Sequence, residues 1–331
     1  MSKRLEAQLA KVKALRYAEN SEKNLELLRG ALGRGEGLVV AEAANVAAEW
    51  YAVELGADLV AAFDRLGVGG YEIDPQCYGK QAAIKALRQL GWGEPEVFMR
   101  ACCLVQLEPV WGDKEDSAAP LRAGAAHALT ECVRASKEQV LGTLIDMLSD
   151  AAWTVRLEAL RAIANSGYAE APWLLRLKLR TGDPEPRVVG ACFDGLLGLE
   201  GADAIPLVAE YLRPPASGSR PPAREPRLDN PLLSEAIASL ASSNLPQAVE
   251  KAVGQWEAVK STPLAKVLLG SLAASPRGEA LEFLLGLIRT APKPIAQQVL
   301  RALKPLMTRT DVSRAVKEQL DQRCDGLTVE G

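Results

Sequence analysis

The sequence predicts an all-α protein, a right-handed α-solenoid (superhelix) of about eight or nine helical hairpins. A pattern of five residues recurs after 34 residues, the distance from Asp116 to Asp150, and a period of this size is typical of stacked helical hairpins. A further copy begins at Asp74, and a looser one at Asp183. The composition agrees, because 48% of the residues are hydrophobic but only 5% are aromatic. The two best copies are Asp116, Arg122, Ala125, Ala128 and Leu129, and Asp150, Arg156, Ala159, Ala162 and Ile163.

Within the copy that begins at Asp116, apolar residues three and four apart predict a first helix over 121–133 and a second over 137–148. Small alanines on the shared face allow neighbouring helices to approach closely. Asp150 stands just before the next helix, where its carboxylate can accept hydrogen bonds from free backbone N–H groups. A single hairpin cannot bury its own apolar face, so neighbouring hairpins must stack.

The Asp and Arg positions and the alanines between them resemble HEAT repeats, especially the short HEAT-like repeats of phycobilisome lyases. Proteins built from such repeats serve as scaffolds, as adaptors and, in a few cases, as enzymes. The resemblance implies that the Asp and Arg side chains link adjacent repeats. It also implies that the second helix of each pair lines the concave side. On that register, the residues expected on the concave surface are Thr143, Asp146, Arg176, Leu179, Leu207 and Glu210.

Two segments interrupt the regular pattern. Extra residues over 107–115, which include Trp111, lengthen the connection after the copy at Asp74. Residues 213–230 hold five prolines and four arginines, which excludes a helix and predicts a mobile loop. The predicted organisation is N-terminal and central repeats over 1–212, this loop, and C-terminal repeats over 231–325 in one continuous solenoid. Further helices are predicted within 4–32, 38–53, 56–66, 171–180, 204–212, 231–243, 246–258, 263–274, 278–290, 294–307 and 311–323.

The remaining composition indicates a cytoplasmic protein. No apolar run reaches the length of about 18 residues that a membrane span requires. The N-terminal segment carries charges throughout and has no apolar signal core. The six cysteines show no CxxC spacing, so we expect reduced core thiols rather than a disulfide framework.

No combination of residues specifies catalysis. His127 is the only histidine, which excludes sites with several histidine ligands. The chain contains neither a GxxxxGK[ST] phosphate loop nor a GxSxG nucleophile turn. The motif of the HEAT-like alkylpurine DNA glycosylases cannot be placed on its aspartates and six tryptophans. We therefore predict no enzymatic activity, no cofactor and no metal site.

The charges are unevenly distributed. The net charge is −3, which disfavours a dedicated duplex-DNA binder. Residues 35–79 hold eight acidic residues and one basic residue, whereas residues 283–317 hold seven basic residues and one acidic residue. Within the second stretch, pairs spaced three apart predict a basic patch of Arg301, Lys304, Arg314 and Lys317. This patch is either a solvated outer face or a contact for an acidic partner or nucleic acid.

The mixed polar and apolar character of the expected concave strip suits a protein or peptide ligand. The sequence thus predicts a non-enzymatic scaffold or adaptor that binds a protein partner through its concave surface. The alternative is a nucleic-acid-binding HEAT-like protein of the alkylpurine DNA glycosylase type.

Overall fold

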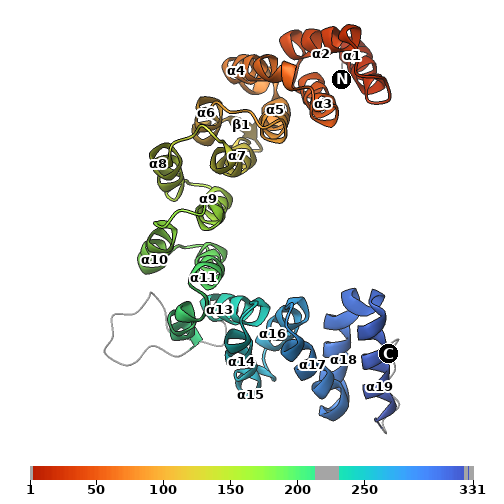
Figure 1. Ribbon diagram of the computed structural model, residues 1–331, viewed down its shortest axis with the longest axis vertical. Helices are drawn as coiled ribbons and strands as arrows, with labels where there is room; N and C mark the ends of the chain where they lie inside the picture. Colours follow the sequence, from red (N-terminus) through yellow and green to blue (C-terminus); the bar gives the residue numbers. More distant parts are fainter. Residues whose placement is uncertain (1–2, 213–230, 324–326, 328–331) are drawn as a thin grey trace. The chain divides into compact units, whose positions relative to one another are not determined.

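The computed structural model describes residues 3–212, 231–323 and 327. The chain divides into two compact units, Met1–Ala171 (unit 1) and Pro172–Gly331 (unit 2). Both units are mostly helical, and each helix packs against helices close to it in sequence, which is consistent with a helical repeat (Figure 1).

The helices of unit 1 alternate between two layers (Figure 1). One layer contains α3, α5, α7 and α9, each packed on the next, and it lies on the inner side of the bend within this unit. The other layer contains α2, α4, α6 and α8. The bounds are α1 (Lys3–Leu15), α2 (Glu22–Arg34), α3 (Gly37–Glu49), α4 (Gly56–Ile73), α5 (Tyr78–Gln89), α6 (Glu96–Cys103), α7 (Ala119–Glu131), α8 (Lys137–Met147) and α9 (Trp153–Asn165), with 3₁₀ turns η1 (Val53–Leu55) and η2 (Pro75–Cys77).

Small residues set the close spacing of the inner layer. A Cβ atom added to Gly79 on α5 would lie 2.9 Å from the carbonyl oxygen of Gly37 on α3, so only glycine permits this approach. The repeated alanines of α7 and α9 are buried, as the pattern predicts: Ala125, Ala128, Ala159 and Ala162. Burial of these faces is the main source of stability in stacked hairpins.

The Asp and Arg of the best repeat link adjacent copies, as the resemblance implies. Arg122 places Nη1 2.7 Å from Asp116 Oδ2 of its own copy and Nε 2.7 Å from Asp150 Oδ2 of the next. Its Nη1 also donates to the Leu104 carbonyl at 2.9 Å. Asp150 in turn accepts a hydrogen bond from the backbone N–H of Ala152 at 2.8 Å, in the manner of a helix cap.

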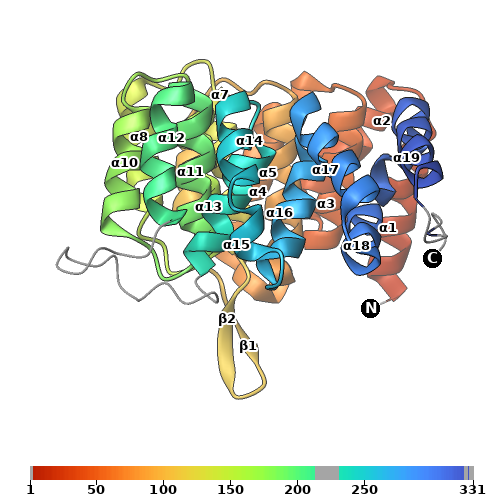
Figure 2. The same ribbon diagram turned by 90° about the horizontal axis from the view of Figure 1, so that it is seen from below.

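The insertion over 107–115 forms a β-hairpin, the only sheet among the described residues. Strand β1 (Leu107–Val110) pairs antiparallel with β2 (Asp113–Asp116), and the hairpin projects away from the helices of unit 1 (Figure 2). The prediction of a purely helical chain is therefore wrong at this point. These strands are only four residues long, too short for alternation of apolar residues to reveal them.

Unit 2 repeats the two-layer arrangement. Helices α11, α13, α16 and α18 pack in succession, and α12, α14, α17 and α19 form the second layer. Ring contacts fill the space between α11 and η4 (Phe193 with Tyr211) and between α15 and α17 (Trp256 with Phe283). The bounds are α10 (Ala171–Thr181), α11 (Pro186–Glu200), η3 (Gly201–Ala204), α12 (Ile205–Ala209), η4 (Glu210–Leu212), α13 (Pro231–Ser242), α14 (Pro246–Val253), α15 (Trp256–Val259), α16 (Leu264–Ala274), α17 (Gly278–Thr290), α18 (Lys293–Leu303), η5 (Lys304–Thr308) and α19 (Thr310–Asp321).

Several predicted boundaries shift. The helix predicted over 56–66 extends to Ile73 as α4, with a break at Gly70, whose φ is +62°. The helix predicted over 294–307 ends at Leu303 and continues as the 3₁₀ turn that contains Pro305. The loop predicted over 213–230 lies outside the described residues. Within the described parts of the chain, no helix combines the length and apolarity needed to cross a membrane.

Candidate functional site

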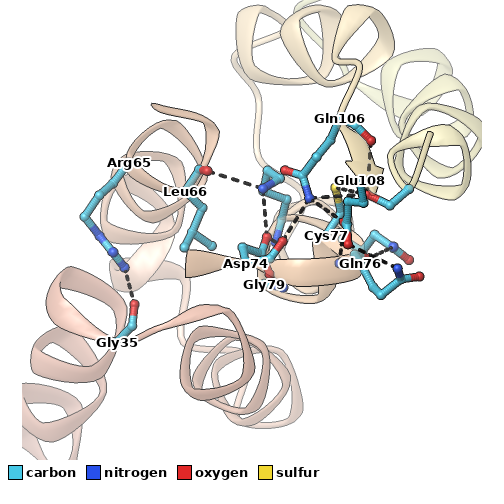
Figure 3. Close-up of polar contacts among 12 residues, drawn as sticks. Gly35, Arg65, Leu66, Asp74, Gln76, Cys77, Gly79, Gln106 and Glu108 are labelled. Carbon is cyan, nitrogen blue, oxygen red and sulfur yellow. Dashed lines mark hydrogen bonds and ion pairs between the residues drawn. The ribbon is translucent and has the colours of Figure 1, made fainter. Parts of the chain in front are cut away.

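A buried polar network ties the base of the hairpin to unit 1 (Figure 3). Its centre is Glu108 on β1, which accepts hydrogen bonds from the backbone N–H of Gln76 at 2.7 Å and from its side-chain amide at 3.2 Å. The Gln106 amide donates to the same carboxylate at 2.9 Å. Burial raises the pKa of Glu108, but hydrogen bonds from Ser117, Gln106 and Gln76 outweigh it and hold the pKa below its ordinary value. Glu108 is therefore an ionised, fully engaged carboxylate.

Gln106 joins two copies of the repeat across the hairpin. Its Nε2 also lies 3.0 Å from the carbonyl oxygen of Asp74, and its backbone N–H donates to Asp116 Oδ1 at 3.1 Å. Ser117 closes the base by donating its backbone N–H to the Gln106 carbonyl at 2.9 Å. The two strands therefore leave the helices at a fixed position.

The backbone on the helical side is strained to meet this network. Gln76 and Cys77 have φ values of 58° and 54°, in the left-handed region that residues other than glycine rarely enter. Each such residue costs on the order of 1 kcal/mol or more. This conformation presents the Gln76 N–H to Glu108, so the contact between η2 and β1 offsets the strain.

The cysteine of this network is a buried thiol. Cys77 is buried, with its Sγ 3.7 Å from Ser117 Oγ. Burial is the main cause that raises the pKa of this thiol, so it is not the thiolate that nucleophilic chemistry needs. In the described part of the chain, no three His, Cys, Asp or Glu side chains are grouped so that they could hold a metal ion. The hydrogen bonds of the network hold the base of the hairpin against the helices.

The tip of the hairpin is exposed. The side chain of Trp111 is fully open to solvent, at 106% relative exposure, and Val110 beside it is 42% exposed. Gly112 completes the two-residue turn with a φ of +79°. Sequence reasoning places Trp111 in an insertion without a role. The available signal is the run of Val110, Trp111, Gly112 and Asp113, in which a glycine follows a β-forming pair at a turn.

Two residues predicted on the concave surface, Thr143 and Asp146, lie in unit 1 on α8. Thr143 is half-buried and Asp146 is exposed. Because α8 belongs to the outer layer, the expectation that this second helix lines the concave side is wrong for unit 1 (Figure 1). A repeat period fixes the length of the unit but not which of its two helices lies on the inner side.

The inner layer of unit 1 carries charges that are paired between helices. Arg88 on α5 places Nε 2.6 Å from Glu131 on α7. His127 on α7 places Nε2 2.9 Å from Glu158 on α9, which also binds Arg161. His127 thus bridges α7 and α9 through this contact.

Of the four residues predicted on the concave surface in unit 2, two lie at the surface and two in the core. Arg176 on α10 donates to Glu200 at 2.9 Å, and Glu210 on η4 pairs with Arg180 at 3.3 Å. Leu179 and Leu207 are buried, so they are core residues and not part of a contact surface. Helical spacing explains Leu179, because it follows the buried Leu175 by one turn. The outward face of α10 instead presents Trp173 and Leu177, at 70% and 62% exposure.

Glu210 also borders a groove of about 420 Å³ between η3–α12 and α14. Its lining is mostly apolar, and Glu210 and Lys251 supply opposite charges. The lining residues are Ala202, Ile205, Pro206, Ala209, Glu210, Gln247 and Lys251.

The four residues of the predicted basic patch are exposed at one end of unit 2. Arg301 lies on α18, Lys304 on η5, and Arg314 and Lys317 on α19. Nearby Arg309 pairs with Asp311 at 2.7 Å. None of the four patch residues forms an ion pair with another described residue, so the patch keeps its positive charge.

Comparison with known proteins identifies no family. No protein-family model matches the chain, and no curated protein matches it. Among solved structures, a distant match is the crystal structure of an engineered protein determined as a Northeast Structural Genomics Consortium target. The two share 16% sequence identity over 97% of each chain, with a TM-score of 0.32. A similarity this loose says nothing about function or partner.

Proposed function

We propose that this protein is a non-enzymatic scaffold or adaptor of the HEAT-repeat type, a cytoplasmic right-handed solenoid that binds a protein partner. The observation that carries the proposal is the hairpin, whose base is held by the buried network while Trp111 is fully exposed at its tip. An exposed tryptophan at the end of a hydrogen-bonded hairpin offers apolar area for recognition and supplies no reacting group. The inner layer of unit 1 is the second surface available to the partner, in place of the outer helix α8.

Affinity purification of the tagged full chain from its native host, followed by mass spectrometry and reconstitution from purified components, tests this function. We expect one protein to be recovered in stoichiometric amount and to bind the purified chain directly. Recovery of nucleic acid alone, or failure of every recovered protein to bind the purified chain, contradicts the proposal.

The basic patch supports a second candidate, a nucleic-acid-binding protein of the HEAT-like alkylpurine DNA glycosylase type. Arg301, Lys304, Arg314 and Lys317 are exposed cations whose charge no described acidic residue neutralises, and such groups bind phosphates. Salt titration of binding to single- and double-stranded DNA separates the two candidates. Tight binding that weakens steeply with salt and disappears in a charge-reversed patch favours this second function. Weak binding that is unchanged in the variant favours the protein scaffold.

A further inference from the structure

We propose that the β1–β2 hairpin is a docking site for a partner protein and that the segment it recognises is cationic, bearing lysine or arginine. This inference rests on the proposed scaffold function and names the chemistry of the partner.

The first argument is exposure. Trp111 is at 106% relative exposure, whereas Trp256 is 7% exposed and even the surface residue Trp173 is 70% exposed. Tryptophan is enriched among the residues that dominate binding energy at protein interfaces. Val110 adds an exposed apolar side chain next to it. The tip therefore offers an anchor that no described residue of its own unit covers.

The second argument is rigidity. Glu108 and Gln106 connect the base of the hairpin to Gln76 and Asp74 through hydrogen bonds of 2.7 and 3.0 Å (Figure 3), and these bonds restrict the position of the strands. Binding to a segment that is already ordered loses less conformational entropy than binding to a free loop. The left-handed residues Gln76 and Cys77 show that the chain accepts strain to build this stem.

The third argument is the charge on one face of the hairpin. Opposed residues share a face, so the pairing of Glu108 with Glu115 and of Val110 with Asp113 places all four side chains on one side. Glu108 is occupied at the base, which leaves Asp113 and Glu115 exposed toward the tip. Neither forms an ion pair with a described residue. Lys114 is the one basic residue of the two strands, and it lies on the opposite face together with Pro109.

The charge pattern is unfavourable for the hairpin itself. Like charges directly opposite each other in an antiparallel pair are destabilising, and Glu115 faces the ionised Glu108. A neutral residue at 115 would suit the strand better. We infer that Glu115 acts on a group outside the chain.

A cationic segment satisfies these features together. The face of an indole ring is the best aromatic site for an ammonium or guanidinium group. Asp113 and Glu115, on the strand that follows the turn, can pair with cations of the same segment, and arginine can bind a carboxylate through two hydrogen bonds. A nucleic acid would meet Asp113 and Glu115 with its phosphates and be repelled, so the same tip disfavours that partner.

The test uses the full chain with nitrogen-15-labelled tryptophan, in which the indole signal of Trp111 is assigned from Trp111→Phe. Octa-arginine is titrated in, with octa-glutamate and single-stranded DNA as the comparison probes. We expect a saturable shift of the Trp111 signal with octa-arginine alone, and an affinity that falls with salt. Absence of a shift, or a larger shift with either anionic probe, overturns the proposal.

Matched variants distinguish the contribution of the Trp111 ring to binding from that of the two carboxylates. Trp111→Ala should weaken binding of octa-arginine by about tenfold or more, and Asp113→Asn with Glu115→Gln by about fivefold. The controls are Trp173→Ala, an exposed tryptophan of unit 2, and Glu36→Gln with Glu54→Gln, exposed acids of unit 1. Both controls should bind like the wild type. Equal losses in controls and hairpin variants would show non-specific attraction and overturn the proposal.

The host partner gives the final discrimination. If the recovered protein binds the wild type and loses affinity in Trp111→Ala and in the Asp113/Glu115 variant, the hairpin and its cationic ligand are both supported. If it binds all variants equally, the scaffold function stands and the hairpin proposal fails. Self-association of the purified chain that is lost in Trp111→Ala would overturn the proposal of a different partner protein, because the ligand would be a second copy.

Discussion

The repeat copies that begin at Asp116 and Asp74 differ in the ion pairs formed by their basic residue. In the copy that begins at Asp116, Arg122 reaches both Asp116 and Asp150, so one side chain links successive repeats. In the copy that begins at Asp74, Lys80 pairs with Asp74 at 3.0 Å, and both side chains are completely buried. Asp74 is the only ion-pair partner of Lys80 among the described residues. Lys80 stands at the repeat position that Arg122 occupies in the other copy. It therefore forms an ion pair within its own copy but none with the next copy.

The hairpin supplies the missing link. Gln106 bonds the Asp74 carbonyl at 3.0 Å and Asp116 Oδ1 at 3.1 Å, and so connects the two copies that Lys80 does not join. The irregular connection between these copies thus replaces an arginine–carboxylate bridge with a neutral amide and the buried Glu108. The comparison teaches that the insertion is part of the stacking, and that it also presents Trp111 to solvent.

The largest expected effect comes from breaking the buried pair. Lys80→Met should lower the free energy of unfolding by about 3–5 kcal/mol, because it leaves the buried Asp74 carboxyl without its ion-pair partner. The two backbone N–H groups that Asp74 accepts, from Gly79 and Lys80, compensate only part of that charge. Urea unfolding, read with hydrogen exchange over α4 and α5, measures the loss.

Lys85→Met on the same helix is the matched control, because Lys85 is exposed. It should change stability by less than about 0.5 kcal/mol. The double variant Asp74→Asn/Lys80→Met should recover part of the loss, since it removes both charges. If Lys80→Met is as stable as the wild type, the buried pair is not what holds this copy together.

Arg122→Lys is expected to have a smaller effect. Lysine keeps the positive charge but has no planar fork to bind two carboxylates, and the Leu104 carbonyl loses its donor. We expect a loss of about 1–3 kcal/mol and faster hydrogen exchange in α7 and α9. Arg88→Lys on the exposed pair with Glu131 serves as the control and should lose no more than about 1 kcal/mol. Equal effects at the two sites would show that burial of Arg122 is unimportant.

The comparison also shows what sequence can and cannot reveal. The spacing of Asp116, Arg122 and Asp150 shows the repeat, and the resemblance to HEAT repeats implies the link that these side chains form. The resemblance to HEAT repeats placed Thr143 and Asp146 on the concave side, and the repeat period could not test this because it carries no information about which layer each helix joins. Leu179 was placed on the surface for a related reason, since an error of one or two positions rotates a residue to the opposite helical face.

The network of Gln106 and Glu108 is beyond sequence reasoning for another reason. Gln76 lies on η2 and Glu108 on β1, whereas Gln106 directly precedes β1 and Ser117 lies between β2 and α7. Nothing in the spacing of these residues indicates that they meet. From the sequence, a single Glu in a four-residue strand is expected to be a solvated charge. The left-handed conformation at Gln76 is what brings a hydrogen-bond donor to it. Tertiary contacts, not local propensity, decide this element.

The smallest expected effect concerns Glu108 and depends on pH. Its pKa is lower in the folded chain than in the unfolded chain, so ionised Glu108 stabilises the fold above the unfolded value of about 4.3. That contribution is lost as the pH falls below this value toward the folded pKa. Glu108→Gln replaces a carboxylate with two acceptor oxygens by an amide with one, so one of the hydrogen bonds from Gln76 is lost. The free energy of unfolding should fall by about 1 kcal/mol at pH 7.

The difference in stability from the wild type should shrink at acidic pH, measured by hydrogen exchange over residues 105–117. Glu115→Gln, on the facing strand but exposed, should show no such loss at pH 7. If Glu108→Gln instead keeps a constant deficit from pH 7 down to pH 3, the carboxylate acts by shape rather than by charge, and the bridge between the two repeat copies does not depend on its ionisation.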